Sequence, residues 1–191
     1  MKSPRNIDSK QLKALIVYFS ATGNTKKVAQ AILNTLKRER VRTTFLQVKE
    51  AAKEELYDYD LVFLGSPSIN WLPAEPVVQF IKEKFKLHRE RGDVKLGAPK
   101  IPGKSAIVFC TYSGPHTGVN EAVPTVKYMG QFLEHLGFEI AGEWCVIGEF
   151  HGNEPASTVG KLGDIRGRPN EQDLMKVEND VVRLLKSGLG V

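Results

Sequence analysis

Apolar and polar positions follow two different periods along this chain. Short apolar runs of strand length alternate with longer segments in which apolar residues recur every three or four positions, as on one face of a helix. The apolar runs predict strands at Ala14–Phe19, Leu61–Gly65, Ser105–Thr111 and Phe138–Ile147, and the alternation of Val41–Val48 predicts one more strand. The periodic segments predict helices at about Thr25–Glu39, Glu50–Tyr57, Ala74–His88 and Glu121–Leu136, and a last helix that starts at Pro169-Asn170.

Strict alternation of strands and helices is typical of a parallel sheet that helices cover on both faces. A chain of 191 residues is long enough for one domain with a sizeable core. We therefore expect a polar tail at residues 1–12 and a single α/β domain at residues 13–191. Asn170 is a suitable N-cap for the last helix. The longest irregular stretch, Gly152–Arg168, has a length at which loops are often functional.

A hydroxyl-rich turn, Ser20-Ala21-Thr22-Gly23-Asn24-Thr25, joins the first strand to the first helix. Backbone N–H groups point outward at a helix N-terminus, and the helix dipole favours negative charge there. The turn adds three hydroxyls, one amide and a glycine that permits close approach or a positive φ. It lacks the lysine of a nucleotide triphosphate loop and the further glycines of a dinucleotide fingerprint. It therefore suits a single phosphate monoester held by hydrogen bonds.

The SATGNT sequence after a buried strand resembles the phosphate-binding loop of the flavodoxin family, whose pattern is close to S/T-x-T-G-N-T. The resemblance extends from Lys13 to Leu185 and implies a flavodoxin-like doubly wound, five-stranded parallel sheet of order 2-1-3-4-5. It also implies flavin mononucleotide (FMN) as the cofactor. Such sheets, of which flavodoxins are themselves a standard example, bind ligands where the strand order reverses. We therefore expect FMN in the loops after the first, third and fourth strands.

The other two loops carry aromatic residues among small polar ones. Trp71 lies in a proline-bracketed loop, where a flat, partly apolar isoalloxazine ring would give it a stacking partner; packing on its own helix or on a partner chain is the alternative. In the loop after the fourth strand, the resemblance implies that Tyr112 stacks on the outer face of the flavin. The candidate cofactor-binding residues are Ser20, Thr22, Gly23, Asn24, Thr25, Ser66, Pro67, Ser68, Ile69, Asn70, Trp71, Thr111, Tyr112, Ser113 and Gly114.

Other reactive side chains point to no catalytic residue and no metal site. His116 and His151 are the two histidine candidates to face the ring, although surface histidines without such a task are commoner. Cys110 and Cys145 lie in apolar runs without metal-ligand spacing, and we interpret them as buried free thiols of a reducing compartment. The chain shows no signal-peptide core and no membrane-length apolar stretch, so we expect a cytoplasmic protein without membrane contact.

The net charge of +5 is concentrated between Lys82 and Lys104, where eight basic residues accompany three acidic ones. This segment is either a solvated surface or a docking site for an acidic protein, a nucleic acid or an anionic cofactor. Without interleaved aromatic residues for base stacking, we do not expect nucleic acid as a partner.

Two functions fit the resemblance. One is a flavodoxin-type carrier that exchanges electrons with a redox partner protein. The other is an NAD(P)H-dependent quinone oxidoreductase, because the TYSG segment also looks like a loop of flavodoxin-like quinone reductases. Carriers of this family are typically acidic near the flavin, whereas Gly65–Pro73 contains no acid, and a peptide flip there would fall to Asn70. The enzyme lacks support from a nicotinamide fingerprint or long insertions, so we favour the carrier. The sequence specifies neither its partner nor its oligomeric state.

Overall fold

The computed structural model describes residues 11–187, so most of the predicted N-terminal tail lies outside the described residues. Its main sheet is parallel throughout, with the order β2-β1-β3-β5-β6. These strands are β1 (Lys13–Tyr18), β2 (Arg42–Gln47), β3 (Leu61–Ile69), β5 (Ser105–Tyr112) and β6 (Glu139–Ile147). The predicted doubly wound, flavodoxin-like order is thereby confirmed for the five long strands.

A short hairpin at the end of β3 adds a sixth strand that the sequence pattern did not predict. Strand β4 (Leu72–Pro73) pairs antiparallel with β3, with Ser68 opposite Pro73 and Ile69 opposite Leu72. The two turn residues, Asn70 and Trp71, have φ values of 48° and 67°, as a type I′ hairpin turn requires. Strand β3 therefore continues past the predicted end at Gly65, because its last residues pair in the hairpin rather than bury an apolar run.

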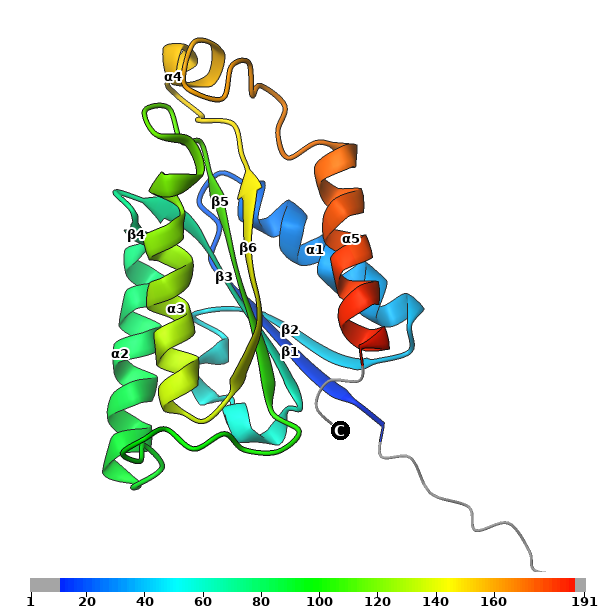
Figure 1. Cartoon of the computed structure of the whole chain (residues 1–191), viewed down its shortest axis with the longest axis vertical. Coiled ribbons are helices and arrows are strands. Elements are labelled where there is room, and N and C mark those ends of the chain that lie inside the picture. Colours follow the sequence, from blue (N-terminus) through cyan, green and yellow to red (C-terminus); the bar gives the residue numbers. More distant parts are fainter. Residues whose placement is uncertain (1–10, 188–191) are drawn as a thin grey trace, which may run out of the picture.

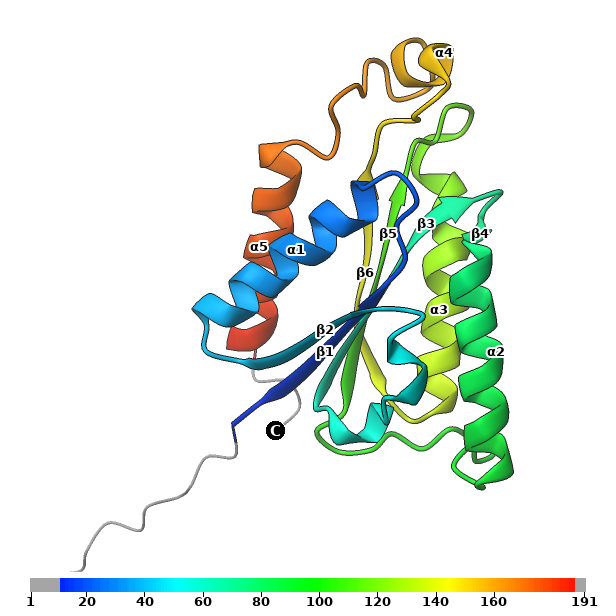
Figure 2. The same cartoon turned by 180° about the vertical axis from the view of Figure 1, so that it is seen from behind.

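Among residues 11–187, four long helices cover the sheet, two on each face; Figures 1 and 2 show the two pairs from opposite sides. Helices α1 (Asn24–Arg38) and α5 (Glu171–Lys186) pack on one face, and α2 (Glu75–Glu90) and α3 (Val123–His135) on the other. The predicted helix at Glu50–Tyr57 is instead two 3₁₀ turns, η1 (Ala51–Lys53) and η2 (Leu56–Asp58). A third 3₁₀ turn, η3 (Gly118–Glu121), precedes α3, and a short unpredicted helix, α4 (Glu154–Thr158), lies within the long irregular stretch.

The core has two layers because alternate residues of each strand face opposite helix pairs. Leu15 and Val17 of β1 face α2 and α3, whereas Ala14 and Ile16 face α1 and α5. Every residue of β5 is buried, as is typical of the centre of a parallel sheet. Since both faces of the sheet are covered, the loops at its carboxyl edge are the part of the sheet free to form a site.

The last helix begins with the predicted cap. The side chain of Asn170 accepts hydrogen bonds from the backbone N–H groups of Gln172 and Asp173, and Asp173 completes a capping box by accepting from the N–H of Asn170. Among the helices formed by residues 11–187, none has both the length and the apolar character needed to span a membrane.

The two cysteines are free and occupy register-partner positions on β5 and β6. Cys110 is fully buried, as predicted, whereas Cys145 is only half-buried.

The basic segment Lys82–Lys104 is not a uniform cationic surface. Lys84 is buried and donates to the backbone oxygen of Glu54. Arg91 pairs with Glu55 at 2.6 Å, and Lys104 pairs with Asp60 at 3.4 Å. These cations therefore join the 3₁₀ turns and the strand ends to the rest of the fold.

Candidate functional site

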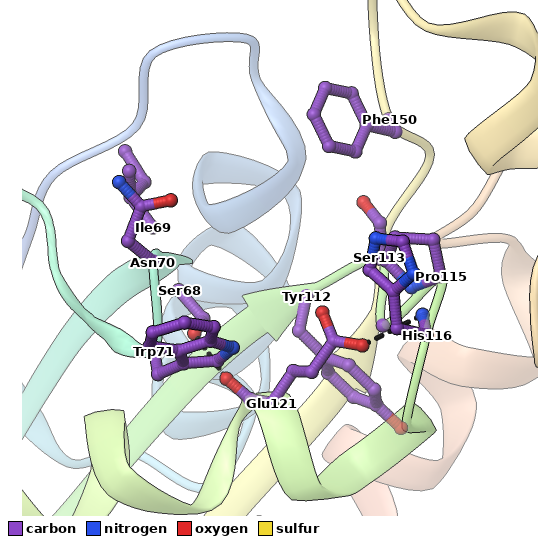
Figure 3. A pocket seen from close by; sticks show the side chains of 11 residues that line it. Ser68, Ile69, Asn70, Trp71, Tyr112, Ser113, Pro115, His116, Glu121 and Phe150 are labelled. Carbon is purple, nitrogen blue, oxygen red and sulfur yellow. Dashed lines mark hydrogen bonds between the residues drawn. The ribbon is translucent and has the colours of Figure 1, made fainter.

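The loops that follow β1, β3, β5 and β6 gather at the carboxyl edge of the sheet, at the top of the molecule in Figure 1. A pocket of about 330 Å³ opens between three of these loops (Figure 3). Of the residues predicted to bind the cofactor, it brings together Ser68, Ile69, Asn70, Trp71, Tyr112, Ser113 and Gly114. Four residues outside that prediction also line it: Pro115, His116, Glu121 and Phe150.

The turn Ser20–Thr25 lies beside this pocket rather than in its wall. Gly23 is the N-cap of α1 with a φ of 101°, a left-handed conformation that favours glycine. Ser20 closes the turn, because its Oγ accepts from the N–H groups of Gly23 at 3.1 Å and Lys26 at 3.2 Å. Thr22 is exposed, and its hydroxyl has no hydrogen-bond partner among residues 11–187. The turn thus keeps a free hydroxyl and a helix N-terminus without acidic side chains.

Two further side chains of the turn are already engaged with neighbouring strands and loops. The Oγ1 of Thr25 lies 2.8 Å from the Oγ1 of Thr111 at the end of β5. The amide of Asn24 donates to the backbone oxygen of Glu149 at 3.0 Å, and its Oδ1 lies 3.4 Å from Nε2 of His151. These contacts hold the turn against the end of β5 and against the segment that follows β6.

The β3–β4 hairpin forms one wall of the pocket. Trp71 is 61% exposed, so it does not pack on its own helix, and Ile69 beside it is 48% exposed (Figure 3). The hairpin is held from below, because the hydroxyl of Ser68 contacts the backbone oxygen of Glu121 and the hydroxyl of Thr125, each at 2.7 Å. The wall therefore presents a large apolar surface on a rigid support.

Three of the predicted residues lie behind the wall. Ser66 is fully buried, and its hydroxyl accepts from the N–H of Ala74 at 2.9 Å and donates to the backbone oxygen of Pro67. Thr111 is buried against Thr25, and Pro67 does not line the pocket. These residues shape the loops, and the exposed part of the hairpin begins at Ser68.

Tyr112 forms the floor of the pocket rather than an outer wall. It is 8% exposed and packs in the core layer of α2 and α3, and burial, followed by the neighbouring Cys145 and Cys110 thiols, raises its pKa. Its side chain lies below the pocket and packs toward α2 and α3, so stacking of Tyr112 on the outer face of a ring stays a prediction (Figure 3).

The opposite wall comes from segments that the sequence prediction did not include. The Oε1 of Glu121 accepts from the backbone N–H groups of His116 at 2.8 Å and Thr117 at 2.6 Å, which places a carboxylate at the pocket. Phe150, 43% exposed, stands across the pocket from Ile69 and Asn70 (Figure 3). The signal that could have identified Phe150 is its position directly after a strand that ends at this edge of the sheet.

The described residues contain no cluster of three or more His, Cys, Asp or Glu side chains able to hold a metal ion. The fold and the pocket therefore define a doubly wound α/β protein with a pocket at the carboxyl edge of its sheet.

Comparison with known proteins agrees with this architecture. Residues 15–82 match the model of the flavodoxin domain family. An NAD(P)H dehydrogenase (quinone) of Archaeoglobus fulgidus is 28% identical over 85% of this chain and 90% of that protein.

Two solved structures have similar folds. A flavodoxin from the domain Archaea has a TM-score of 0.60 at 15% identity and covers 92% of this chain and 98% of that one. Oxidised flavodoxin 2 of Bacillus cereus has a TM-score of 0.63 at 20% identity, and the match covers 92% of this chain and 99% of that one. The chain therefore resembles the flavodoxin domain family over residues 15–82 and shares its fold with solved flavodoxins.

Proposed function

We propose that this chain is a flavodoxin-type electron-transfer protein that binds FMN at the carboxyl edge of its sheet. The observation that supports this proposal most is that two features lie next to each other at this edge. One is a hydroxyl-rich turn at the N-terminus of α1, and the other is a pocket of about 330 Å³ with an exposed tryptophan in its wall. The first suits a phosphate and the second a flat aromatic ring, and the pocket volume lies in the range of small-ligand sites.

The residues present fit the two ends of FMN. The free hydroxyl of Thr22 and the backbone N–H groups at the start of α1 would hold the phosphate. Trp71 and Ile69 would pack against the ring, and Ser113 and Gly114 would border its polar edge. When bound, FMN supplies the one-electron and two-electron chemistry, and the protein sets its orientation, potential and access to solvent.

The carboxylate of Glu121 favours the carrier function. It is half-buried at the pocket and anchored by two backbone N–H groups, so its negative charge stays close to a bound ring. A nearby negative charge opposes the addition of further negative charge, which lowers the reduction potential of the ring. An acid at the pocket, expected of a carrier and absent from Gly65–Pro73, is thus supplied from another part of the chain.

The alternative function is NAD(P)H-dependent quinone reduction. The relative from Archaeoglobus fulgidus, an NAD(P)H dehydrogenase (quinone), supports it at 28% identity. The redox partner is accordingly either another redox protein or NAD(P)H with a quinone. We further propose that residues 13–191 act as one domain in the cytoplasm, which two free cysteines on neighbouring strands support.

The test begins with the flavin-free protein and FMN, whose fluorescence changes on binding. The loaded protein is then reduced anaerobically with dithionite and followed by absorbance, and separately mixed with NADH or NADPH and a benzoquinone. Two separated one-electron steps without NAD(P)H turnover support the carrier. A single two-electron step with NAD(P)H-driven quinone reduction supports the alternative, and failure to bind FMN refutes both functions.

A further inference from the structure

A short segment after β6 crosses the sheet edge between the pocket and the turn Ser20–Thr25. This segment, Gly148–Gly152, joins β6 to the stretch that contains α4, and Phe150 within it faces the pocket (Figures 1 and 3). The three loops expected to bind a cofactor follow β1, β3 and β5, so this segment is additional to them.

Hydrogen bonds hold the backbone N–H and carbonyl groups of the first three residues of this segment. The N–H of Gly148 donates to Tyr112 O at 2.8 Å, and its carbonyl accepts from the hydroxyl of Ser113 at 2.9 Å. The carbonyl of Glu149 accepts from the amide of Asn24 at 3.0 Å. The N–H and the carbonyl of Phe150 both contact the hydroxyl of Ser157, at 2.9 and 3.2 Å.

The fit against the turn is close. A Cβ atom on residue 148 would lie 2.8 Å from Nδ2 of Asn24, so a side chain at this position would displace the Asn24 amide. The Asn24 side chain is 7% exposed, and one of its two amide hydrogens is directed at Glu149. Asn24 therefore positions the segment after β6, which leaves the turn with fewer free donors than its sequence suggests.

Two side chains of the segment are more exposed than the backbone atoms that anchor it. The ring of Phe150 stands free across the pocket from Ile69 and Asn70. The side chain of His151 is 42% exposed, with Nε2 at 3.4 Å from Asn24 Oδ1 and Nδ1 at 4.0 Å from a carboxylate oxygen of Glu149. One aromatic ring thus faces the pocket, and one N–H donor lies beside the turn.

We propose that Gly148–Gly152 is a fourth cofactor-binding segment, in which Phe150 packs against the flavin ring and His151 donates a hydrogen bond to the phosphate. The inference rests on the proposed binding of FMN at this edge. Phe150 takes the outer aromatic position that the buried Tyr112 leaves open. His151 supplies a donor beside Asn24, whose own amide is partly engaged.

The two roles are separable with FMN and riboflavin, because riboflavin carries the ring without the phosphate. Dissociation constants for both flavins are measured by fluorescence titration of the flavin-free protein. Phe150→Ala is compared with Val159→Ala, which truncates an apolar side chain that is 81% exposed further along the same stretch. His151→Gln is compared with His135→Gln, which changes an exposed histidine on α3, away from the pocket.

We expect Phe150→Ala to weaken FMN and riboflavin alike, by about fivefold to tenfold. His151→Gln is expected to weaken FMN by about tenfold and riboflavin by less than about twofold. Both control variants retain the wild-type constants, and retained riboflavin binding shows that His151→Gln is folded.

Each other outcome has a definite meaning. If the wild-type chain binds FMN and both variants bind within about twofold of it, the fourth segment is refuted while the proposed function stands. A change in only one variant refutes the role of the other residue. If the wild-type chain binds neither flavin, the proposed function itself falls and this inference falls with it.

Discussion

Thr25 and Thr111 share a buried hydrogen bond that joins the turn after β1 to the end of β5. Their Oγ1 atoms are 2.8 Å apart, and the two residues are 1% and 3% exposed. Within residues 11–187, neither hydroxyl has another hydrogen-bond partner. We predict that removing one of these hydroxyls destabilises the fold more than removing both.

The magnitude follows from what each change leaves behind. Thr25→Val preserves the side-chain shape but leaves the hydroxyl of Thr111 buried without a partner, which costs about 1–3 kcal/mol. Thr111→Val has the same effect on Thr25. The double variant leaves no unpaired polar group, so its cost is expected to be below about 1 kcal/mol. For a chain of this size, each 1 kcal/mol lowers the melting temperature by about 2–4 °C.

The assay is urea unfolding of the flavin-free protein, followed by circular dichroism. Thr22→Val is the control, because Thr22 is exposed and unpartnered among the described residues, and its stability is expected to stay within about 0.5 kcal/mol of wild type. The same control weakens FMN binding if Thr22 holds the phosphate. Losses in the double variant that equal the sum of the two single losses would refute the reasoning, because the hydroxyls would then be independent.

Three further changes test the fold around the site. Gly65→Ala places a Cβ atom 2.1 Å from Cζ of Phe109, so we expect the free energy of unfolding to fall by about 1–3 kcal/mol in thermal unfolding. The loss should be smaller in a Phe109→Leu background, and equal losses in both backgrounds would contradict the clash. Burial, and then two neighbouring carboxylates, raise the pKa of Tyr57 from 10.0 to about 12. Because the folded state keeps a proton that the unfolded state releases, the free energy of unfolding should fall as the pH rises from 10.0 to about 12. Tyr57→Phe should lessen this fall, and a variant with the same pH profile as wild type would contradict the prediction. Asn170→Ala removes the α5 cap and is expected to cost about 1 kcal/mol in urea unfolding, whereas no loss would show that the cap is dispensable.

The sheet was predictable because its order depends on features that recur along the whole chain. Most of the long strands contain an apolar run, β2 alternates between apolar and polar residues, and the long helices each have one apolar face. The alternation of these strands and helices indicates a parallel, doubly covered sheet. The β3–β4 hairpin was not predictable in this way. Its strand residues, including Ser68 and Ile69, neither alternate nor form an apolar run, and a type I′ turn normally carries Asn or Gly where this chain has Trp71.

The turn and the pocket differ in how far apart in the sequence their residues lie. The turn Ser20–Thr25 combines a strand end, a glycine and a helix start within six residues, so its character is visible in the sequence. The burial of Tyr112 depends on its phase within β5, where it faces the same layer as Val108 and Cys110. Alternation along that strand could have indicated its burial, but the family resemblance suggested an outer position instead. Glu121 and Phe150 reach the pocket only through the packing of segments that are distant in sequence.

The turn and the pocket carry charges of opposite sign, which the proposed binding of FMN would place at its phosphate and at its ring. At the turn, Lys26 and Lys27 lie in the first turn of α1, where the helix dipole is positive and no acidic side chain offsets it. At the pocket, the half-buried Glu121 is held by two backbone N–H groups and contributes negative charge. In the proposed binding mode, a phosphate would be stabilised at the turn, whereas added electron density on the ring would be opposed at the pocket. A basic chain would then still produce a low-potential flavin, because the reduction potential responds to the charge nearest the ring rather than to the net charge of the protein.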